Sequence, residues 1–358
     1  MSEIKVNSIK GVAASTAAIT VNNTDGTCTA NITNNLSNRN KIINGGMTVS
    51  QRNGTTVVTG VNTTGYRIDR WTHQIASINS AFSVSQSTDT PDGFGNSYKI
   101  DVTTADTSLA AAHAHFFRQK IEGQNLQDFA KGTSAAKQFA VSFYVKTNKT
   151  GLYTVELYDV DNNRAISKTF TVADSNWNRY TLIYPADTTG AFGNDNGNSL
   201  VLQFWLSAGS DYTSGTLNTS AWAAATQANR VSSSNVNLGD NTSNEWYLTG
   251  VQLEVGSVAT DFEHRSFGQE FTLCQRYYAV AGTIMQTGTP HRWVNTIHLP
   301  VEMRAKPTIS NGAFDSGSGG AIASQWDSSS GNNSQRCFYQ SGDHSSVSAS
   351  YWKFDAEL

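Results

Sequence analysis

Apolar and polar residues alternate with a period of two through most of the middle of the chain. The clearest run, 138–146, places Phe139, Val141, Phe143 and Val145 on one face. This alternation predicts half-buried β-strands, because successive side chains of a strand point to opposite sides of its sheet. Further candidate strands lie at 66–75, 82–85, 98–103, 112–120, 151–159, 166–172, 179–184, 199–206 and 245–255.

Short strands at close spacing, separated by turns rich in Gly, Asn and Asp, are typical of an antiparallel sandwich rather than a parallel sheet. We therefore expect an all-β jelly-roll or β-sandwich domain over residues 42–276. The stretch 207–237 is a long loop without clear strands, which in a compact domain suggests a functional loop or one ordered by a partner. A shorter helical turn is expected at 125–131.

One helix interrupts the β pattern near residue 270. Ser266 and Gln269 form a capping-box pattern, and Phe267, Phe271, Cys274 and Tyr278 recur at i, i+4, i+7 and i+11. This helix is expected to join the sandwich to a smaller C-terminal β domain, residues 277–358. Candidate strands of that domain lie at 292–299, 307–310, 336–340 and 347–354.

Residues 1–41 have a different composition, with no Trp, Tyr or Phe. Such a segment cannot build a hydrophobic core alone. Two interpretations remain open: a flexible tail, or an extended attachment segment that is ordered by oligomerisation.

The composition narrows the class of protein. Charged residues make up only 15% of the 358 residues, against roughly 25% in an average globular domain. The net charge of −3 comes without a basic stripe, so nucleic-acid binding is not expected. No apolar run is long enough for a membrane helix and no signal-peptide core is visible, so we expect synthesis in a cytoplasm without membrane insertion.

Catalytic signatures are missing from the sequence. No P-loop, GxGxxG, HExxH or GxSxG pattern occurs, so no enzyme activity, catalytic residue or cofactor is predicted. The carboxylates nearest a predicted sheet end are interpreted as partners of arginines such as Arg265 and Arg276, rather than as a glycosidase pair. They are Glu245, Glu254, Asp261 and Glu263.

Metal binding is weakly suggested at two places. His113 and His115 are two residues apart on a predicted strand, but a third ligand is missing. Asp159, Asp161 and Asn163 resemble the start of a calcium loop whose Gly and distal Glu are absent, so a hairpin turn is favoured. The three cysteines are far apart and suggest neither a zinc site nor a disulfide scaffold. No metal is predicted.

Several sequence segments carry a family resemblance in their order and spacing. They are NKIINGGM at 40–47, VSQR at 49–52, YRIDRW at 66–71, VQLEVG at 251–256, ATDFE at 259–263, LCQRYY at 273–278 and LPVEMRAKPT at 299–308. Together they resemble a domain that recurs in tail-fibre proteins of tailed bacteriophages, and residues 138–255 also look like the jelly roll of carbohydrate-binding modules. We refer to these segments as the family motifs.

The motif residues also have structural interpretations. Asn44 and the two glycines after it predict a turn with positive φ. Trp71 is expected to be a core anchor, Asp69 and Arg70 a pair, and Arg276 to pack the helix exit against the sheet.

The resemblance implies a virion protein: a homotrimeric tail fibre that binds other phage tail proteins through residues 1–41. Its distal end would bind a host surface glycan or an outer-membrane receptor. Alternatives are a purely structural adaptor or decoration protein and, less favoured because no repeat of 20–50 residues is present, a polysaccharide depolymerase. Aromatic rings in loops are the receptor-binding candidates, because sugars stack on flat rings. They are Trp326, Tyr339, Trp352, Tyr212 and Trp222.

Overall fold

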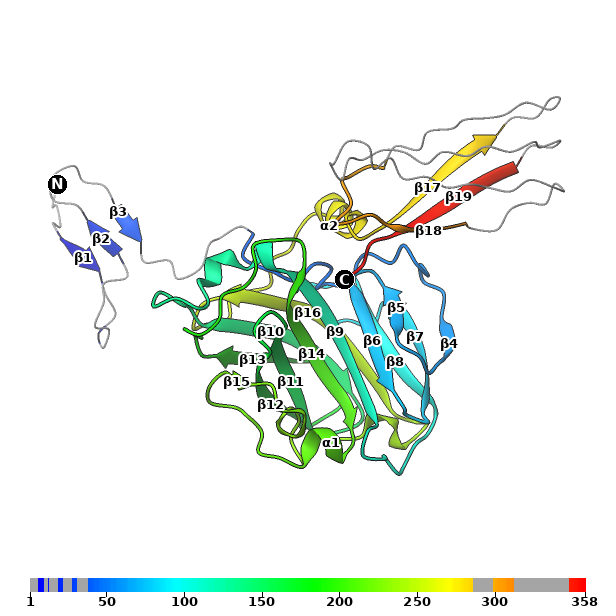
Figure 1. Cartoon of the computed structure of the whole chain (residues 1–358), viewed down its shortest axis with the longest axis horizontal. Coiled ribbons are helices and arrows are strands. Elements are labelled where there is room, and N and C mark those ends of the chain that lie inside the picture. The colour runs from blue at the N-terminus through cyan, green and yellow to red at the C-terminus, as the bar shows by residue number, and fades with distance from the viewer. Residues whose placement is uncertain are drawn as a thin grey trace.

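The computed structural model describes residues 38–285, 299–311 and 348–358, and the short pieces 6–9, 12, 19–21 and 28–30. A two-layer sandwich forms the centre, and a small C-terminal sheet projects from one edge of it (Figure 1). Strands β1 (Ser8–Ile9), β2 (Ile19–Val21) and β3 (Cys28–Ala30) pair in a separate N-terminal sheet. Within the described residues, no helix is both long and apolar enough to cross a membrane.

The sandwich consists of two antiparallel sheets. The first has the order β13 (Asn178–Tyr184), β10 (Phe139–Thr147), β16 (Glu245–Val255), β8 (Ser97–Thr104), β7 (Ala81–Ser87) and β4 (Val58–Val61). The second has the order β15 (Ala223–Ala224), β12 (Arg164–Val172), β11 (Gly151–Asp159), β14 (Asn198–Ala208), β9 (Ala114–Glu122), β6 (Trp71–Ala76) and β5 (Gly65–Ile68).

The core lies between these two sheets. Phe139, Val141, Phe143 and Val145 are all fully buried in it, as the alternation predicts. Trp71 is also fully buried and stacks on the ring of Phe117, with centroids 5.0 Å apart. The expected all-β sandwich, followed by a short helix and a smaller β unit, is therefore confirmed.

One predicted strand is in fact two. The stretch 66–75 forms a tight hairpin of β5 and β6, in which Ile68 pairs with Trp71. Arg70 in the turn has a φ of 71°, a left-handed conformation that sequence alternation does not reveal. The expected helical turn at 125–131 is two 3-10 turns, η1 (Gly123–Asn125) and η2 (Gln127–Phe129).

The loop 207–237 folds onto the outer face of the seven-stranded sheet. It contains α1 (Ser210–Thr213), β15 and η3 (Gln227–Asn229), and η4 (Leu238–Asp240) follows it. Its Val231 and Tyr212 pack on Trp205 and Phe116, which point outward from the sheet and are buried by the loop. The loop is therefore ordered by the sandwich itself.

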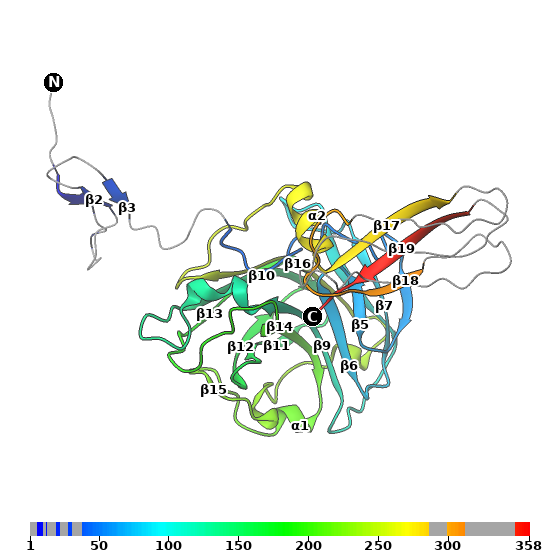
Figure 2. The same cartoon turned by 45° about the horizontal axis from the view of Figure 1, so that its top comes forward.

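Helix α2 (Phe267–Gln275) leads from the sandwich to the C-terminal sheet. Its capping box between Ser266 and Gln269 is confirmed. Cys274 is buried as expected, but Phe267 is 62% exposed, so the predicted apolar face is wrong at its first position. It is also wrong at its last position, because α2 ends at Gln275 and Tyr278 begins β17. Figure 2 shows β17 (Tyr278–Met285), β19 (Ser348–Asp355) and β18 (Thr308–Asn311) extending away from the sandwich in that order.

Candidate functional site

Residues 38–41, which lead into the sandwich, are hydrogen-bonded to β16 and to the segment that follows it. The side-chain amide of Asn40 donates to the carbonyl of Val251 at 3.1 Å, and its oxygen accepts the backbone N–H of Leu253. Glu263 accepts the backbone N–H groups of Asn38 and Asn40, at 2.5 and 2.8 Å. Residues far apart in sequence thus form one hydrogen-bonded edge.

Close packing, rather than positive φ, explains Gly45. The positive φ values of this turn belong to Asn44 (58°) and Met47 (55°). A Cβ on Gly45 would lie 2.1 Å from the carbonyl oxygen of Val251, so only glycine allows the segment to approach β16. The expected turn with positive φ is therefore confirmed at Asn44, whereas the two glycines after it do not adopt positive φ.

Asn44 and Asp69 organise the next part of the edge. The side-chain amide of Asn44 donates to the backbone carbonyls of Val49 and Asp69. The backbone carbonyl of Asn44 accepts the indole N–H of Trp71 at 3.1 Å. Asp69 accepts both the backbone and the side-chain N–H of Gln51. Burial raises the pKa of Asp69 to about 6, and the Gln51 hydrogen bonds oppose that rise.

Two expected pairings of arginines are corrected. Arg70 does not pair with Asp69 but forms a buried ion pair with Glu357, and its guanidinium lies 3.4 Å from the ring centroid of Tyr277. Arg276 binds the buried carboxylate of Glu122 on β9, at 3.0 Å, which packs the helix exit against the sheet as expected, although its partner is none of the acids singled out in the sequence. The two pairs join segments 287 and 154 residues apart. Trp71 is confirmed as a core anchor.

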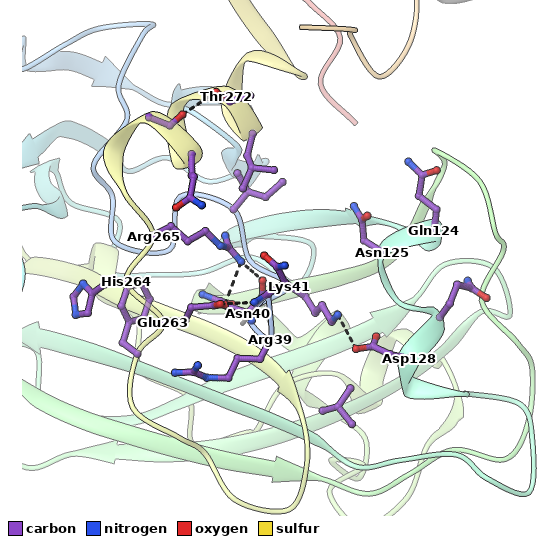
Figure 3. A pocket seen from close by; sticks show the side chains of 18 of the residues that line it. Arg39, Asn40, Lys41, Gln124, Asn125, Asp128, Glu263, His264, Arg265 and Thr272 are labelled. Carbon is purple, nitrogen blue, oxygen red and sulfur yellow. Dashed lines mark hydrogen bonds and ion pairs between the residues drawn. The ribbon is translucent and has the colours of Figure 1, made fainter. Parts of the chain in front are cut away.

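A pocket of about 1480 Å³ opens beside this edge, between α2 and the 3-10 turns η1 and η2 (Figure 3). This volume exceeds the about 300–1,000 Å³ of typical small-molecule sites. Lining residues include Asn38, Arg39, Asn40, Lys41, Gln124, Asn125, Gln127, Asp128, Lys137, Phe262, Glu263, His264, Arg265, Gln269 and Thr272.

The charges around the pocket are largely paired. Lys41 and Asp128 form an ion pair of 2.7 Å, marked by a dashed line in Figure 3. Arg265 donates to the backbone carbonyls of Asn40 and Ile42. The side chains of Asn125, Lys137 and His264 are exposed. The pocket thus offers amides, a cation and an imidazole that can bind the hydroxyl groups of a ligand.

The two carboxylates of the pocket have structural partners. Asp128 binds Lys41, and Glu263 binds backbone N–H groups. Of the other acids singled out in the sequence, Glu254 binds Thr260 and lies 3.7 Å from Arg39, and Glu245 lies 3.2 Å from Lys99. The backbone carbonyl of Asp261 accepts from Arg39 and Gln252.

The residues considered as metal ligands in the sequence also bind other protein groups. His115 points into the core and binds His73, whereas His113 precedes β9 and lies 3.1 Å from Asp106, so the two imidazoles do not converge. Asp159 ends β11 and pairs with Arg164 across the expected hairpin turn. Among the described residues, no group of three or more His, Cys, Asp or Glu could hold a metal ion.

The structure places three of the five receptor-binding candidates. Trp222 is 6% exposed in the sandwich core and Trp352 is 1% exposed in the core of the C-terminal sheet, so neither ring is a surface platform. Tyr212 is half-buried against Trp205. Trp326 and Tyr339 lie outside the described residues.

Sequence reasoning missed the pocket. Its exposed polar residues Asn125, Gln127 and Lys137 lie between predicted strands. The residues of the opposite wall of the pocket, 262–273, come about 130 residues later in the sequence. The one available signal was that the family motifs at 40–47 and 259–263 contain lining residues.

No protein-family model matches the chain, and no curated protein matches it. Solved structures with some likeness include the enzymatically active domain of tailspike protein 4 from bacteriophage CBA120, at 14% identity and a TM-score of 0.31. That likeness covers 60% of this chain but only 21% of the tailspike chain. A family 11 carbohydrate-binding module from Clostridium thermocellum has 11% identity and a TM-score of 0.28, covering 60% and 98% of the two chains. TmCBM61 in complex with β-1,4-galactotriose has 9% identity and a TM-score of 0.29, and the likeness covers 61% of this chain and 99% of that module.

Proposed function

We propose that this protein is a tail-fibre component of a bacteriophage virion and binds a glycan of the host cell surface through its β-sandwich. The observation that carries the glycan proposal is the pocket beside α2, whose wall consists mainly of amides and charged groups. Sugars present many hydroxyl groups, each of which can both donate and accept hydrogen bonds, and amide side chains match this pattern. The size of the pocket suits an oligosaccharide.

The fibre assignment rests on the family motifs. In the structure their residues meet at the edge where α2 leaves the sandwich, through pairs such as Asn40 with Val251 and Asn44 with Trp71. Because residues of the family motifs bind one another, we expect proteins that share these motifs to form the same sandwich edge.

We further propose that the protein acts by binding, without catalysis. The carboxylates of the pocket, Asp128 and Glu263, are held by Lys41 and by backbone N–H groups. A glycosidase needs one carboxyl group as proton donor and a second as base or nucleophile, and this pairing disfavours both roles.

Homotrimerisation and attachment to other tail proteins through residues 1–41 belong to the same proposal. Oligomerisation can order a segment that lacks core-forming side chains. Light scattering of the full-length protein is expected to give a trimer, and a stable monomer would contradict it. A variant lacking residues 1–37, which keeps the contacts of Asn38 to Lys41 with the sandwich, should keep its thermal transition but fail to assemble on particles.

The glycan proposal is tested with the full-length protein on an array of bacterial surface polysaccharides. The double variant Asn125→Ala, Lys137→Ala removes two exposed pocket groups and should reduce binding about 10-fold or more. The matched control Asn176→Ala changes an exposed amide in the turn after β12 and should bind like the wild type. Equal binding by all three proteins would exclude the pocket as the glycan site.

A further inference from the structure

A row of polar side chains crosses the outer face of the seven-stranded sheet. The strand register pairs Glu156 on β11 with Gln203 on β14, Gln203 with Arg118 on β9, and Arg118 with Thr72 on β6. Directly paired residues of neighbouring strands project from the same face. These four residues therefore lie side by side, on the opposite side of the sheet from the hydrophobic core.

The negative charge in this row is fully engaged. Glu156 is completely buried, and its carboxylate accepts two hydrogen bonds from Arg230, at 2.8 and 3.1 Å. The side-chain N–H groups of Gln203 and Trp205 donate to the same carboxylate, at 2.8 and 2.9 Å. Glu156 is thus committed to Arg230 and to its two neighbours on β14.

Arg118 has a different environment. Its guanidinium is half-buried and donates to the neutral amide oxygen of Gln74 at 2.6 Å. Its Nε is buried and has no hydrogen-bond acceptor, and the described part of the chain holds no carboxylate within ion-pair distance of it. The side-chain oxygen of Gln203 beside it is also buried without a donor. Leaving such groups unsatisfied costs stability, and among the described residues the half-buried guanidinium of Arg118 keeps no carboxylate partner of its own.

A second cation lies two residues further along β9. Lys120 projects from the same face and donates to the main-chain oxygen of Leu358. Burial and then the charge of Arg118 lower the pKa of Lys120 to about 8. The nearest acid toward the C-terminal end, Glu357, is bound to Arg70. Arg118 and Lys120 thus place two cationic side chains on one face of β9.

Aromatic rings border the same patch. Tyr158, on β11 beside Glu156, is half-buried with its ring 5.4 Å from the Arg230 guanidinium. Tyr66, on β5, is half-buried and donates its hydroxyl to Leu358. The ring of Phe116 lies under Arg118, at 5.4 Å. Rings next to a hydrogen-bonding fork are a combination suited to a sugar ring with a charged substituent.

We propose that the sheet face around Arg118 and Lys120 binds the carboxylate of an acidic sugar. The planar guanidinium binds a carboxylate with two parallel hydrogen bonds, and Lys120 adds a point charge. The inference deepens the proposed function by naming an acidic glycan as the ligand, and it places the acidic residue on a surface separate from the pocket beside α2.

The experiment measures binding of matched probes to the full-length protein by calorimetry. The pairs are sialyllactose with lactose, and a galacturonate tetramer with the corresponding galactose tetramer. The acidic member of at least one pair should bind at least about 10-fold more tightly, and Arg118→Gln should remove that advantage, since hydrogen bonds to charged groups are the strong ones. Arg118→Lys, which keeps the charge but loses the fork, should retain part of it.

Lys137→Gln is the matched control, because it removes an exposed cation from the pocket beside α2. If Lys137→Gln abolishes the preference and Arg118→Gln does not, the carboxylate binds in the pocket: the inference fails and the proposed glycan function stands. No preference for either acidic probe overturns the inference. Displacement of the acidic probe by inorganic phosphate at equal concentration also overturns it, because the site would then accept any anion.

Discussion

The ammonium of Lys131 lies 2.5 Å from a carboxylate oxygen of Asp159, and both side chains are completely buried. The carbonyls of Thr189 and Gly190 accept from the same nitrogen, at 2.9 and 2.8 Å, and a carboxylate oxygen of Asp187 lies 3.1 Å away. Four oxygens therefore surround one lysine nitrogen at the end of the sandwich. The ammonium of Lys131 thus neutralises the carboxylate of Asp159, one of the residues that resembled a calcium loop in the sequence.

Replacing Lys131 with methionine should destabilise the sandwich by about 3–5 kcal/mol, because breaking a buried ion pair leaves Asp159 charged and uncompensated. Urea unfolding followed by tryptophan fluorescence measures the effect. Lys137→Met, at an exposed position six residues along, is the control and should stay within about 0.5 kcal/mol of the wild type. An equal loss of stability in both variants would mean that the four oxygens around the Lys131 nitrogen contribute nothing specific.

A pair of core histidines should make the protein sensitive to acid. His73 and His115 are fully buried, their rings joined by a 3.1 Å hydrogen bond, and His73 also binds the hydroxyl of Tyr98 at 2.7 Å. Burial lowers the pKa of His115 from 6.5 to about 3. Burial, and then the neighbouring His115, lower the pKa of His73 well below its ordinary value.

The folded state therefore keeps both imidazoles neutral, whereas the unfolded chain takes up protons below a pH of about 6.5. The contribution is fully present above that pH and is lost as the pH falls toward the folded-state value, by about 1.4 kcal/mol per pH unit for each histidine. His115→Gln should be less stable near neutral pH but lose stability less steeply below pH 6.5. Parallel stability curves for the two proteins would show that His115 does not govern the acid response.

Glu357→Gln should loosen the attachment of the C-terminal sheet. The carboxylate of Glu357 is buried between Arg70 and Arg52, and its removal leaves Arg70 without a counter-ion, at a cost of about 3 kcal/mol. Asp355→Asn is the control, because Asp355 binds Arg52 but is 40% exposed, and such pairs contribute about 1 kcal/mol or less. Thermal unfolding of both variants separates the buried pair from the exposed one; equal shifts would contradict the expectation.

Trp326 and Tyr339 remain the candidates for receptor contact in the C-terminal domain, because Trp352 is buried, and Trp326 is the one we test. Trp326→Ala should reduce adsorption of particles to host cells, by a few kcal/mol at most, with an unchanged melting temperature. Trp352→Ala should instead lower the melting temperature, since it removes a core side chain. Normal adsorption by Trp326→Ala would move the receptor site to another loop.

The strands of the sandwich could be predicted because their pattern is local. Phe139 to Val145 alternate within one strand, and Ser266 and Gln269 cap a helix within four residues. The edge of the sandwich and the pocket could not be predicted in this way. The partner of Arg70 is 287 residues away and that of Asn40 is 211 residues away, and no periodicity relates such positions.

The burial of single residues was equally hard to infer from the sequence. A loop of polar composition predicts an exposed Trp222, yet its indole N–H donates to Pro185 and its ring packs on Phe139. Similarly, Glu156 alternates like an outward-facing strand residue, and only the loop 207–237 that folds back over it explains its complete burial. Both outcomes depend on how a loop packs, which is a property of the whole fold.

The buried pair of Arg70 with Glu357, together with Arg52 and Asp355, has a mechanical consequence. These contacts tie the segment that follows residue 38 directly to the end of β19, on the same edge of the sandwich (Figure 1). Tension applied between the two ends of the chain would reach this clamp after only the short stretch from residue 38 to Arg52. That stretch is also bonded to β16 at Asn40 and Lys41, so the load would pass along one edge of the sandwich and leave the other strands of the two sheets outside its path.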